Sequence, residues 1–234
     1  MTTRADHRVA HRFGGVWTEI KLKALADYLQ FYQSVLRGEK FETWYVDAFA
    51  GTGDRHALIE TGGIFDAKPH GLEERLLEGS ARKALRIDPP FDHFWFAEQN
   101  KKRAAALSAL RSEFVGRDIQ IRPGEANAEL RRLFTSSPWI GRDAWKQRAV
   151  VFLDPYGMSV DWATLKLLAD TQRADVWYLF PRAAVVRQLA HDLNAIDADK
   201  RLRLKQIFGG EEWVQEFYRA RPAQGGLFDE AVLT

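Results

Sequence analysis

The sequence predicts a doubly wound α/β domain, in which helices cover both faces of a largely parallel sheet. The first observation is a set of five short, almost purely apolar runs, at residues 43–49, 91–97, 118–121, 149–153 and 175–180. Such runs are typical of strands that are buried on both faces of a parallel sheet. The second observation is that stretches with apolar residues at steps of three and four separate these runs, as amphipathic helices do. Strands that alternate with helices favour this fold class, with right-handed crossovers.

Helices are also expected before the first strand and after the last one. Residues 17–36 have helical spacing and precede the first strand. Residues 202–208 and 211–219 follow the last strand, and Gly209 and Gly210 separate them because glycine commonly ends a helix. The sequence therefore predicts an N-terminal helix, a sheet domain and a C-terminal helical tail.

The length of 234 residues allows one large domain with an appendage, at roughly 150 residues per domain. The expected boundaries are residues 1–40 for an N-terminal helical extension, 41–190 for the sheet domain and 191–234 for the tail. Residues 54–79 interrupt the alternation of strand and helix and contain several glycines and a proline. They are predicted to form an irregular insertion or lid.

The composition is that of an ordinary globular protein, with 46% apolar and 28% charged residues. The absence of cysteine excludes thiolate zinc sites, iron–sulfur clusters and a cysteine nucleophile within this chain. His7 and His11 are one helical turn apart, but no third ligand accompanies them, so no metal site is predicted. The net charge of +2 is too small to argue for a nucleic-acid partner by itself. Without a signal peptide or a long apolar run, we expect a cytoplasmic protein with no membrane span.

In a doubly wound sheet, ligands bind at the carboxyl ends of the strands, so the residues after each strand are candidates for the site. The first strand ends in Asp47, Ala48 and Phe49, which Gly51 and Gly53 follow. Glycines at this point let the backbone turn sharply and approach a ligand closely. The alternative is a tight turn without a ligand, since the third glycine of a dinucleotide-binding GxGxxG motif is absent.

The second strand ends in Glu98, which Gln99 follows. A carboxylate here can accept hydrogen bonds from both ribose hydroxyls of an adenosine-type cofactor. The alternative is a carboxylate that the dipole of the next helix favours. Glu98 lies 98 − 53 = 45 residues after Gly53, against about 20 in a dinucleotide site, and the insertion accounts for the excess. Ser80 opens the helix between these strands, where it would cap exposed amides or direct them at a ligand carboxylate.

The third strand leads into Glu125, Ala126 and Asn127, which are placed to meet the edge of an adenine ring. A helix N-cap is the equally acceptable alternative for Glu125. The fourth strand ends in Asp154, which Pro155 follows. Proline fixes the backbone directly after a buried strand, so the Asp154 carboxylate would face the crevice and could hold the protons of an amino group.

Tyr156 follows Asp154 and Pro155 and would supply a flat face on which a planar base could stack. The alternative for this segment is a type I turn with proline at its second position. We favour a site because an ionised carboxylate next to an apolar run needs a partner.

Six ordered motifs resemble those of the three-Cys-motif partner protein family (TcmP). They are VDAFAGTG, FAEQNKKR, GEAN, VFLDPYG, DVWYLFP and IFGGEEW, and the resemblance covers about residues 17–218. The resemblance implies a Rossmann-like class I methyltransferase sheet that uses S-adenosylmethionine. It also implies a separately encoded partner protein that carries the cysteines. Such a sheet has seven strands when complete, and five are predicted here. Either the last strands are missing from this chain, or the tail GGLFDEAVLT has an unexpected structure.

By the same resemblance, the glycine turn with Asp47 would surround the methionine part of the cofactor, and Glu98 its ribose. Lys21 matches a lysine of the family's N-terminal helix that could reach the cofactor carboxylate, although a solvated lysine on the polar side of that helix is the favoured interpretation. Asp154, Pro155 and Tyr156 resemble the (D/N/S)PP(Y/F) signature of amino-group methyltransferases, although only one proline is present.

The first functional hypothesis is therefore a methyltransferase that methylates an amino group, most plausibly of a nucleobase. The alternative is a non-catalytic, Rossmann-like scaffold that binds the three-Cys-motif protein. A nicotinamide-dependent oxidoreductase is disfavoured, because both GxGxxG and a catalytic Tyr/Lys or His constellation are absent. The sequence predicts no oligomeric state.

Overall fold

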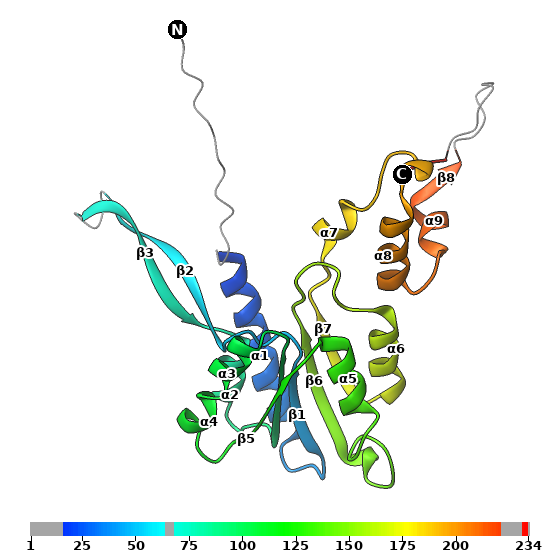
Figure 1. Ribbon diagram of the computed structural model, residues 1–234. Helices are drawn as coiled ribbons and strands as arrows, with labels where there is room; N and C mark the ends of the chain where they lie inside the picture. Colours follow the sequence, from blue (N-terminus) through cyan, green and yellow to red (C-terminus); the bar gives the residue numbers. More distant parts are fainter. Residues whose placement is uncertain (1–15, 64–67, 221–230, 234) are drawn as a thin grey trace, which may run out of the picture.

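A computed structural model describes residues 16–63, 68–220 and 231–233 of the chain (Figure 1). Its centre is a five-stranded sheet with the order β5-β4-β1-β6-β7 and parallel pairing throughout. The strands are β1 (Glu42–Asp47), β4 (His93–Glu98), β5 (Asp118–Pro123), β6 (Gln147–Leu153) and β7 (Ala174–Tyr178). All five predicted strands are confirmed, and so is the doubly wound α/β class.

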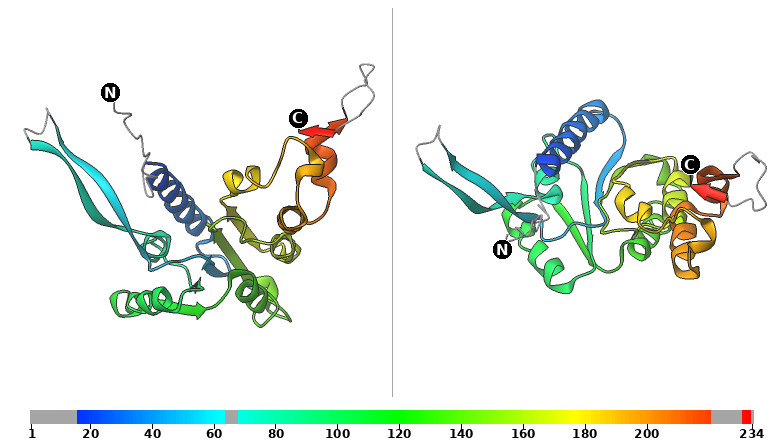
Figure 2. Two further views of the ribbon diagram at one scale, coloured as in Figure 1. Left: turned by 45° about the horizontal axis from the view of Figure 1, so that its top comes forward. Right: turned by 90° about the horizontal axis from the view of Figure 1, so that it is seen from above.

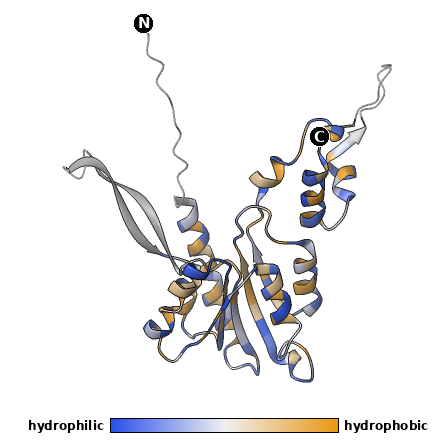
Figure 3. Cartoon of the chain, in the orientation of Figure 1, coloured by the Kyte–Doolittle hydropathy of each residue, from blue (hydrophilic) through white to orange (hydrophobic). Residues whose placement is uncertain are grey.

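The helices cover both faces of the sheet because successive strand residues point to opposite sides. Tyr45 of β1 packs in one apolar cluster with α1 (Val16–Leu36), α2 (Ser80–Leu85) and α3 (Lys101–Leu107). Trp44 and Val46 pack in a second cluster, with the helices of the other face. Those helices are α5 (Ala126–Phe134) and α6 (Trp162–Thr171), while the short α4 (Leu110–Glu113) follows α3. Figure 3 shows the hydrophobic residues along the strands and the helices that cover them.

The N-terminal helix is confirmed as α1, and its buried side is part of the core. Leu22, Leu25 and Leu29 lie in the same apolar cluster as the sheet residues Tyr45 and Phe94. The ring of Tyr28 lies 5.0 Å from the ring of Trp177 in β7, measured between centroids. This packing carries α1 across one face of the sheet and brings its first turns to the carboxyl ends of the strands.

The insertion at residues 54–79 is not irregular, and that part of the prediction was wrong. It forms an antiparallel hairpin of β2 (Asp54–Gly63) and β3 (Lys68–Glu78). The hairpin extends away from the sheet, on the side opposite the C-terminal elements (Figures 1 and 2). The glycines and the proline that indicated irregular structure gather near its tip, where Gly63 pairs with Lys68. Turn residues at the tip of a long hairpin therefore resemble those of a loop.

The tail contains the two predicted helices, α8 (Ala198–Phe208) and α9 (Glu212–Phe217), after a short α7 (Arg182–Val186). Gly209 ends α8 in the left-handed conformation, with φ of 83°. The helix predicted for residues 211–219 ends earlier, because β8 (Tyr218–Ala220) begins there and pairs with β9 (Ala231–Leu233). The tail has its own small core, formed by Val185, Ile196, Leu204, Ile207, Trp213 and Tyr218.

Two short 3-10 turns complete the described elements, at Ala144–Lys146 and Leu193–Ala195. The sheet has five strands within the described part of the chain, and β7 forms one of its edges. No helix in the described ranges is both long and apolar enough to cross a bilayer.

Candidate functional site

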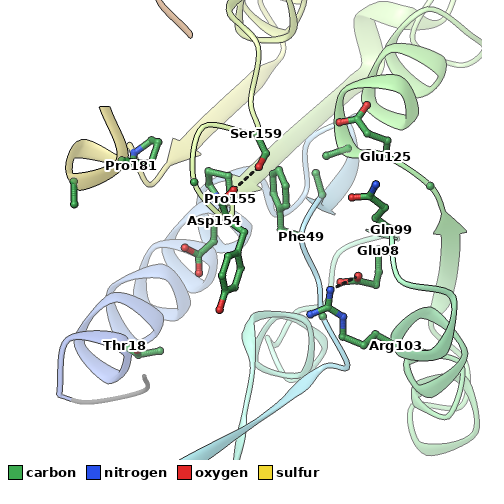
Figure 4. A pocket seen from close by; sticks show the side chains of 18 of the residues that line it. Thr18, Phe49, Glu98, Gln99, Arg103, Glu125, Asp154, Pro155, Ser159 and Pro181 are labelled. Atoms are coloured by element: carbon green, nitrogen blue, oxygen red, sulfur yellow. Dashed lines mark hydrogen bonds and ion pairs between the residues drawn. The ribbon is translucent and has the colours of Figure 1, made fainter. Parts of the chain in front are cut away.

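A cleft of about 710 Å³ opens at the carboxyl end of the sheet (Figure 4). Strand register places the ends of neighbouring strands at one level, since Asp47 pairs with both Phe96 and Phe152. The strand order reverses direction between β1 and β6, which is the topological switch point where such sheets bind ligands. The predicted residues that line the cleft are Lys21, Ala48, Phe49, Gly51, Glu98, Gln99, Glu125, Ala126, Asp154, Pro155 and Tyr156.

The cleft has two halves with Phe49 between them (Figure 4). We call the side with Glu98, Gln99, Arg103 and Glu125 the Glu98 half. We call the other side the Asp154 half. It is lined by Thr18, Lys21, Asp154, Pro155, Tyr156, Gly157, Ser159, Pro181, Ala183, Ala184 and Arg187. The first half is built on β4 and β5, and the second on β6, β7, α1 and α7.

In the Glu98 half, the Glu98 carboxylate is held in a fixed direction. Its Oε1 atom accepts a hydrogen bond of 2.8 Å from the backbone amide of Asn100. The same oxygen lies 3.0 Å from a guanidinium nitrogen of Arg103, and only 7% of the Glu98 side chain is exposed. Oε2 accepts no hydrogen bond from the described residues. A buried carboxylate with one oxygen anchored can offer the other to hydroxyl groups of a ligand.

Asn100 explains why this end of β4 is so well ordered. Its side chain caps α3 by accepting from the backbone amides of Lys102 and Arg103. The cap starts α3 directly after the strand and brings the Arg103 side chain back over Glu98.

Glu125 caps α5, which is the alternative that the sequence left open. Its carboxylate accepts hydrogen bonds from the backbone amides of Asn127 and Ala128, both at 2.9 Å, and from the Asn127 side chain at 2.7 Å. Both oxygens therefore have partners within the protein, although Glu125 still lines the cleft. Its contact with an adenine stays a prediction.

In the Asp154 half, the Asp154 carboxylate follows β6 directly and is about one-third exposed, at 37%. Its Oδ2 atom accepts a hydrogen bond from the ammonium of Lys21 on α1, which is 29% exposed. Lys21 is therefore not a solvated lysine. It reaches the cleft, but it contacts Asp154 instead of standing apart for a cofactor carboxylate.

The loop after β6 is held from below by Asn127, a buried side chain on α5. Its amide donates to the carbonyl of Ser159 at 2.8 Å, and its oxygen accepts from the Asp161 amide and the Thr164 hydroxyl. These bonds tie the loop that carries Asp154 to the start of α5. Asn127 thus positions both halves of the cleft without lining it.

Tyr156 is the most exposed aromatic residue of the cleft, with 78% of its surface accessible. Its backbone carbonyl accepts a hydrogen bond from the Ser159 hydroxyl, which closes the turn. A ring in this position offers a face to a planar ligand at the rim.

Three further predicted residues, Asp47, Ser80 and Gly53, are set back from the cleft wall. Asp47 is fully buried and accepts hydrogen bonds from the Ser80 hydroxyl at 2.5 Å and the Phe49 amide at 3.0 Å. Burial raises the pKa of Asp47 to about 6, and the hydrogen bonds from Ser80 and Phe49 oppose that rise. The predicted cap by Ser80 was wrong, because Gly79 is the N-cap of α2 and the Ser80 hydroxyl is directed at Asp47.

The two glycines of the first turn have different reasons to be glycine. Both have positive φ, 62° at Gly51 and 84° at Gly53. A Cβ atom at Gly53 would meet Leu110 at 3.0 Å, whereas nothing lies within 4 Å of one at Gly51. Gly53 therefore allows Leu110 of α4 to pack closely against the turn. Gly51 lines the cleft and leaves the space next to it without a side chain.

Sequence reasoning missed the contribution of α7 and of the first turn of α1. Pro181, Ala183, Ala184 and Arg187 form a wall after β7, and Thr18 lies near the opening. A strand end followed by proline was the available signal for α7. Arg187 has no motif around it, so its position could come only from the structure. Within the described residues, no cluster of His, Asp and Glu could hold a metal ion.

No family model matches the chain, and no curated protein matches it. A similar solved structure is protein LPL1258 from Legionella pneumophila str. Philadelphia 1, assigned to the family model DUF519. It is 13% identical, and the similarity covers 83% of this chain and 75% of that one, with a TM-score of 0.49.

Proposed function

We propose that this protein is an S-adenosylmethionine-dependent methyltransferase that methylates an amino group, namely the exocyclic amine of a nucleobase. The observation that carries the proposal is the placement of two carboxylates, Glu98 and Asp154, in one cleft at the ends of different strands. The environment of Glu98 suits the cofactor, and the environment of Asp154 suits the acceptor amine.

The residues of the Glu98 half fit the adenosine part of the cofactor. The free Oε2 of Glu98 would accept hydrogen bonds from the ribose hydroxyls, while Asn100 and Arg103 hold Oε1. Gln99 lines the same half and Phe49 borders it, so an adenine ring would lie against the apolar side chain of Phe49. A cleft of about 710 Å³ lies within the range of cofactor sites.

The residues of the Asp154 half fit an acceptor amine. The Asp154 carboxylate would accept an N–H of the amine, turn the nitrogen lone pair toward the cofactor and stabilise the positive charge that develops on nitrogen. The ammonium of Lys21 donates to Oδ2, and this contact supports the role of the carboxylate as an acceptor for N–H groups. When bound, S-adenosylmethionine would supply the methyl group from its sulfonium and leave as a neutral thioether, and the methylated nitrogen would lose its proton to solvent. The protein supplies alignment of the two reactants and the charge of Asp154.

The shared premise is tested by isothermal titration of the protein with S-adenosylmethionine. We expect heat with a one-to-one stoichiometry and no heat with NADH under the same conditions. A thermal-shift measurement gives an independent readout, since a ligand at 100 times its Kd adds about 2.7 kcal/mol of stability. Absence of binding by folded protein would contradict the proposal. Cofactor binding without methyl incorporation into any nucleic acid would favour the non-catalytic scaffold.

A further inference from the structure

The ion pair between Lys21 and Asp154 has a consequence for any reaction that makes the acceptor nitrogen positive. The ammonium of Lys21 donates a hydrogen bond to Oδ2 of Asp154. A cation at that point cancels much of the carboxylate charge and repels a second positive charge next to it. An Asp154 that serves a reacting amine must therefore lose Lys21 as its partner.

The displaced ammonium needs a new anionic partner within the cleft. The Lys21 side chain is only 29% exposed, so leaving it without a counter-ion would be unfavourable. The other carboxylates of the cleft are already engaged. Glu98 pairs with Arg103, and both oxygens of Glu125 accept amide hydrogen bonds from the first turn of α5. The new partner must then come with a ligand.

A second cation lies in the same half of the cleft. Arg187 follows α7 and lines the same cleft as Lys21, and its side chain makes no hydrogen bond or ion pair with the described residues. Arg182, at the start of α7, is also exposed. The Asp154 half therefore contains two cations, Lys21 and Arg187, and one anion, Asp154. One positive charge is in excess. A monoanionic group would balance that charge.

We propose that the Asp154 half binds a phosphate-bearing acceptor, a nucleotide within a single strand, and that Lys21 moves from Asp154 to a phosphate of that strand when the base enters. The inference rests on the proposed function and names its substrate class. Arg187 contacts the phosphate backbone of the strand. Tyr156 at the rim stacks on a base, as aromatic residues do in single-strand binding sites. Lys21 acts as a positioning residue, because its departure gives Asp154 its full charge only when a phosphate is present.

Oligonucleotides with and without backbone charge test this inference directly. The probes are a fluorescent single strand of about 12 nucleotides and mixed sequence, and the same strand with uncharged methylphosphonate linkages. Fluorescence anisotropy gives Kd at several salt concentrations. We expect the charged strand to bind at least tenfold more tightly than the uncharged one at low salt.

Variants assign that difference to the two cations. Arg187→Gln and Lys21→Gln should each weaken binding of the charged strand about tenfold. Each should also lower the slope of log K against log salt by about 0.7, the value for one phosphate contact on a single strand. Lys205→Gln is the matched control, because Lys205 is an exposed cation of α8 that does not line the cleft. It should change Kd less than twofold, and Lys21→Arg should keep the wild-type slope.

The uncharged strand should reverse the sign of the Lys21 effect. With no phosphate to receive the ammonium, Lys21→Gln should bind the methylphosphonate strand as tightly as the wild type or more tightly. Equal binding of the two strands by the wild type would overturn the inference. So would a Lys21→Gln variant that loses affinity for S-adenosylmethionine but not for the charged strand, because the lysine would then serve the cofactor. Normal strand binding without cofactor binding would contradict methyl transfer and leave the phosphate site standing.

Discussion

The two halves of the cleft hold their carboxylates in different ways. In the Glu98 half, a backbone amide and an arginine fix one oxygen of Glu98, and the side chain is only 7% exposed. In the Asp154 half, the carboxylate is 37% exposed and its partner is a lysine on a separate helix. A fixed carboxylate suits a ligand that binds in the same way at each turnover. A carboxylate with an exchangeable partner suits a ligand whose charge changes during the reaction.

The largest expected effect comes from removing the charge of the Asp154 half. Asp154→Asn keeps the shape of the side chain and should lower the rate of methyl transfer by about 10²–10³-fold, as loss of one charge-stabilising group does. Affinity for S-adenosylmethionine should change little, which calorimetry checks. Asp170→Asn, an exposed aspartate of α6, is the control. Full activity of Asp154→Asn would remove the difference between the halves.

The next effect concerns Asn127, which connects the two halves. Asn127→Asp removes the amide hydrogens that Ser159 and Glu125 accept, and it places a carboxylate beside that of Glu125. The free energy of unfolding should fall by about 3 kcal/mol, because buried acceptors lose their donors. Denaturant titration measures this change, with exposed Asn194→Asp expected to stay within about 0.5 kcal/mol of the wild type. A neutral result for Asn127→Asp would show that the halves are not coupled through α5.

A smaller effect is expected from Glu98, because Glu98→Gln keeps the shape of the side chain and one acceptor oxygen while it loses the charge that pairs with Arg103. Glu98→Gln should weaken S-adenosylmethionine binding about tenfold, which corresponds to about 1.4 kcal/mol. The rate with saturating cofactor should change less than the affinity does. Glu216→Gln, an exposed site on α9 outside the cleft, is the matched control for calorimetry. A variant that binds the cofactor normally would show that Glu98 has only a structural role.

The last effect is a pH dependence that belongs to neither half. Burial raises the pKa of Asp47 from 3.8 to about 6, so the native state binds a proton that the unfolded state releases between these values. The stability contributed by that proton is present at low pH and is lost as pH rises through about 6.

Asp47→Asn should therefore flatten the decrease in stability between about pH 4 and pH 7. Across this range the free energy of unfolding should fall by roughly 1–3 kcal/mol more in the wild type than in the variant, measured by thermal or chemical unfolding at both ends of the range. Asp199→Asn, at an exposed position of α8, should leave the wild-type profile intact. A variant with the wild-type pH dependence would refute the assignment to Asp47.

Much of this architecture could be predicted from periodicity. Apolar runs such as residues 149–153 predicted the strands, and the carboxyl ends of these strands predicted where the cleft lies. The direction of a polar side chain at a strand end was harder to predict. Asp47 and Asp154 both follow apolar residues, yet Asp47 points into the core and Asp154 into the cleft. That choice depends on helix packing, which a single strand does not encode.

The remaining differences have similar causes. Glu125 stands where either a helix cap or a ligand contact is possible, and the residue type suits both. Arg187 enters the cleft only because α7 turns back over the sheet after β7, and no local pattern specifies such a return. The partner of Lys21 lies 133 positions away in the chain, beyond the reach of any motif.

The β2–β3 hairpin begins and ends at almost the same point in space. The amide of Gly79 donates to the carbonyl of Gly53 at 2.9 Å, so the chain leaves and rejoins the domain across a single hydrogen bond. Because its two ends lie so close together, the hairpin could be replaced by a two-residue link without moving β1 or α2. The chain can therefore vary the length and chemistry of this arm independently of the fold that bears it.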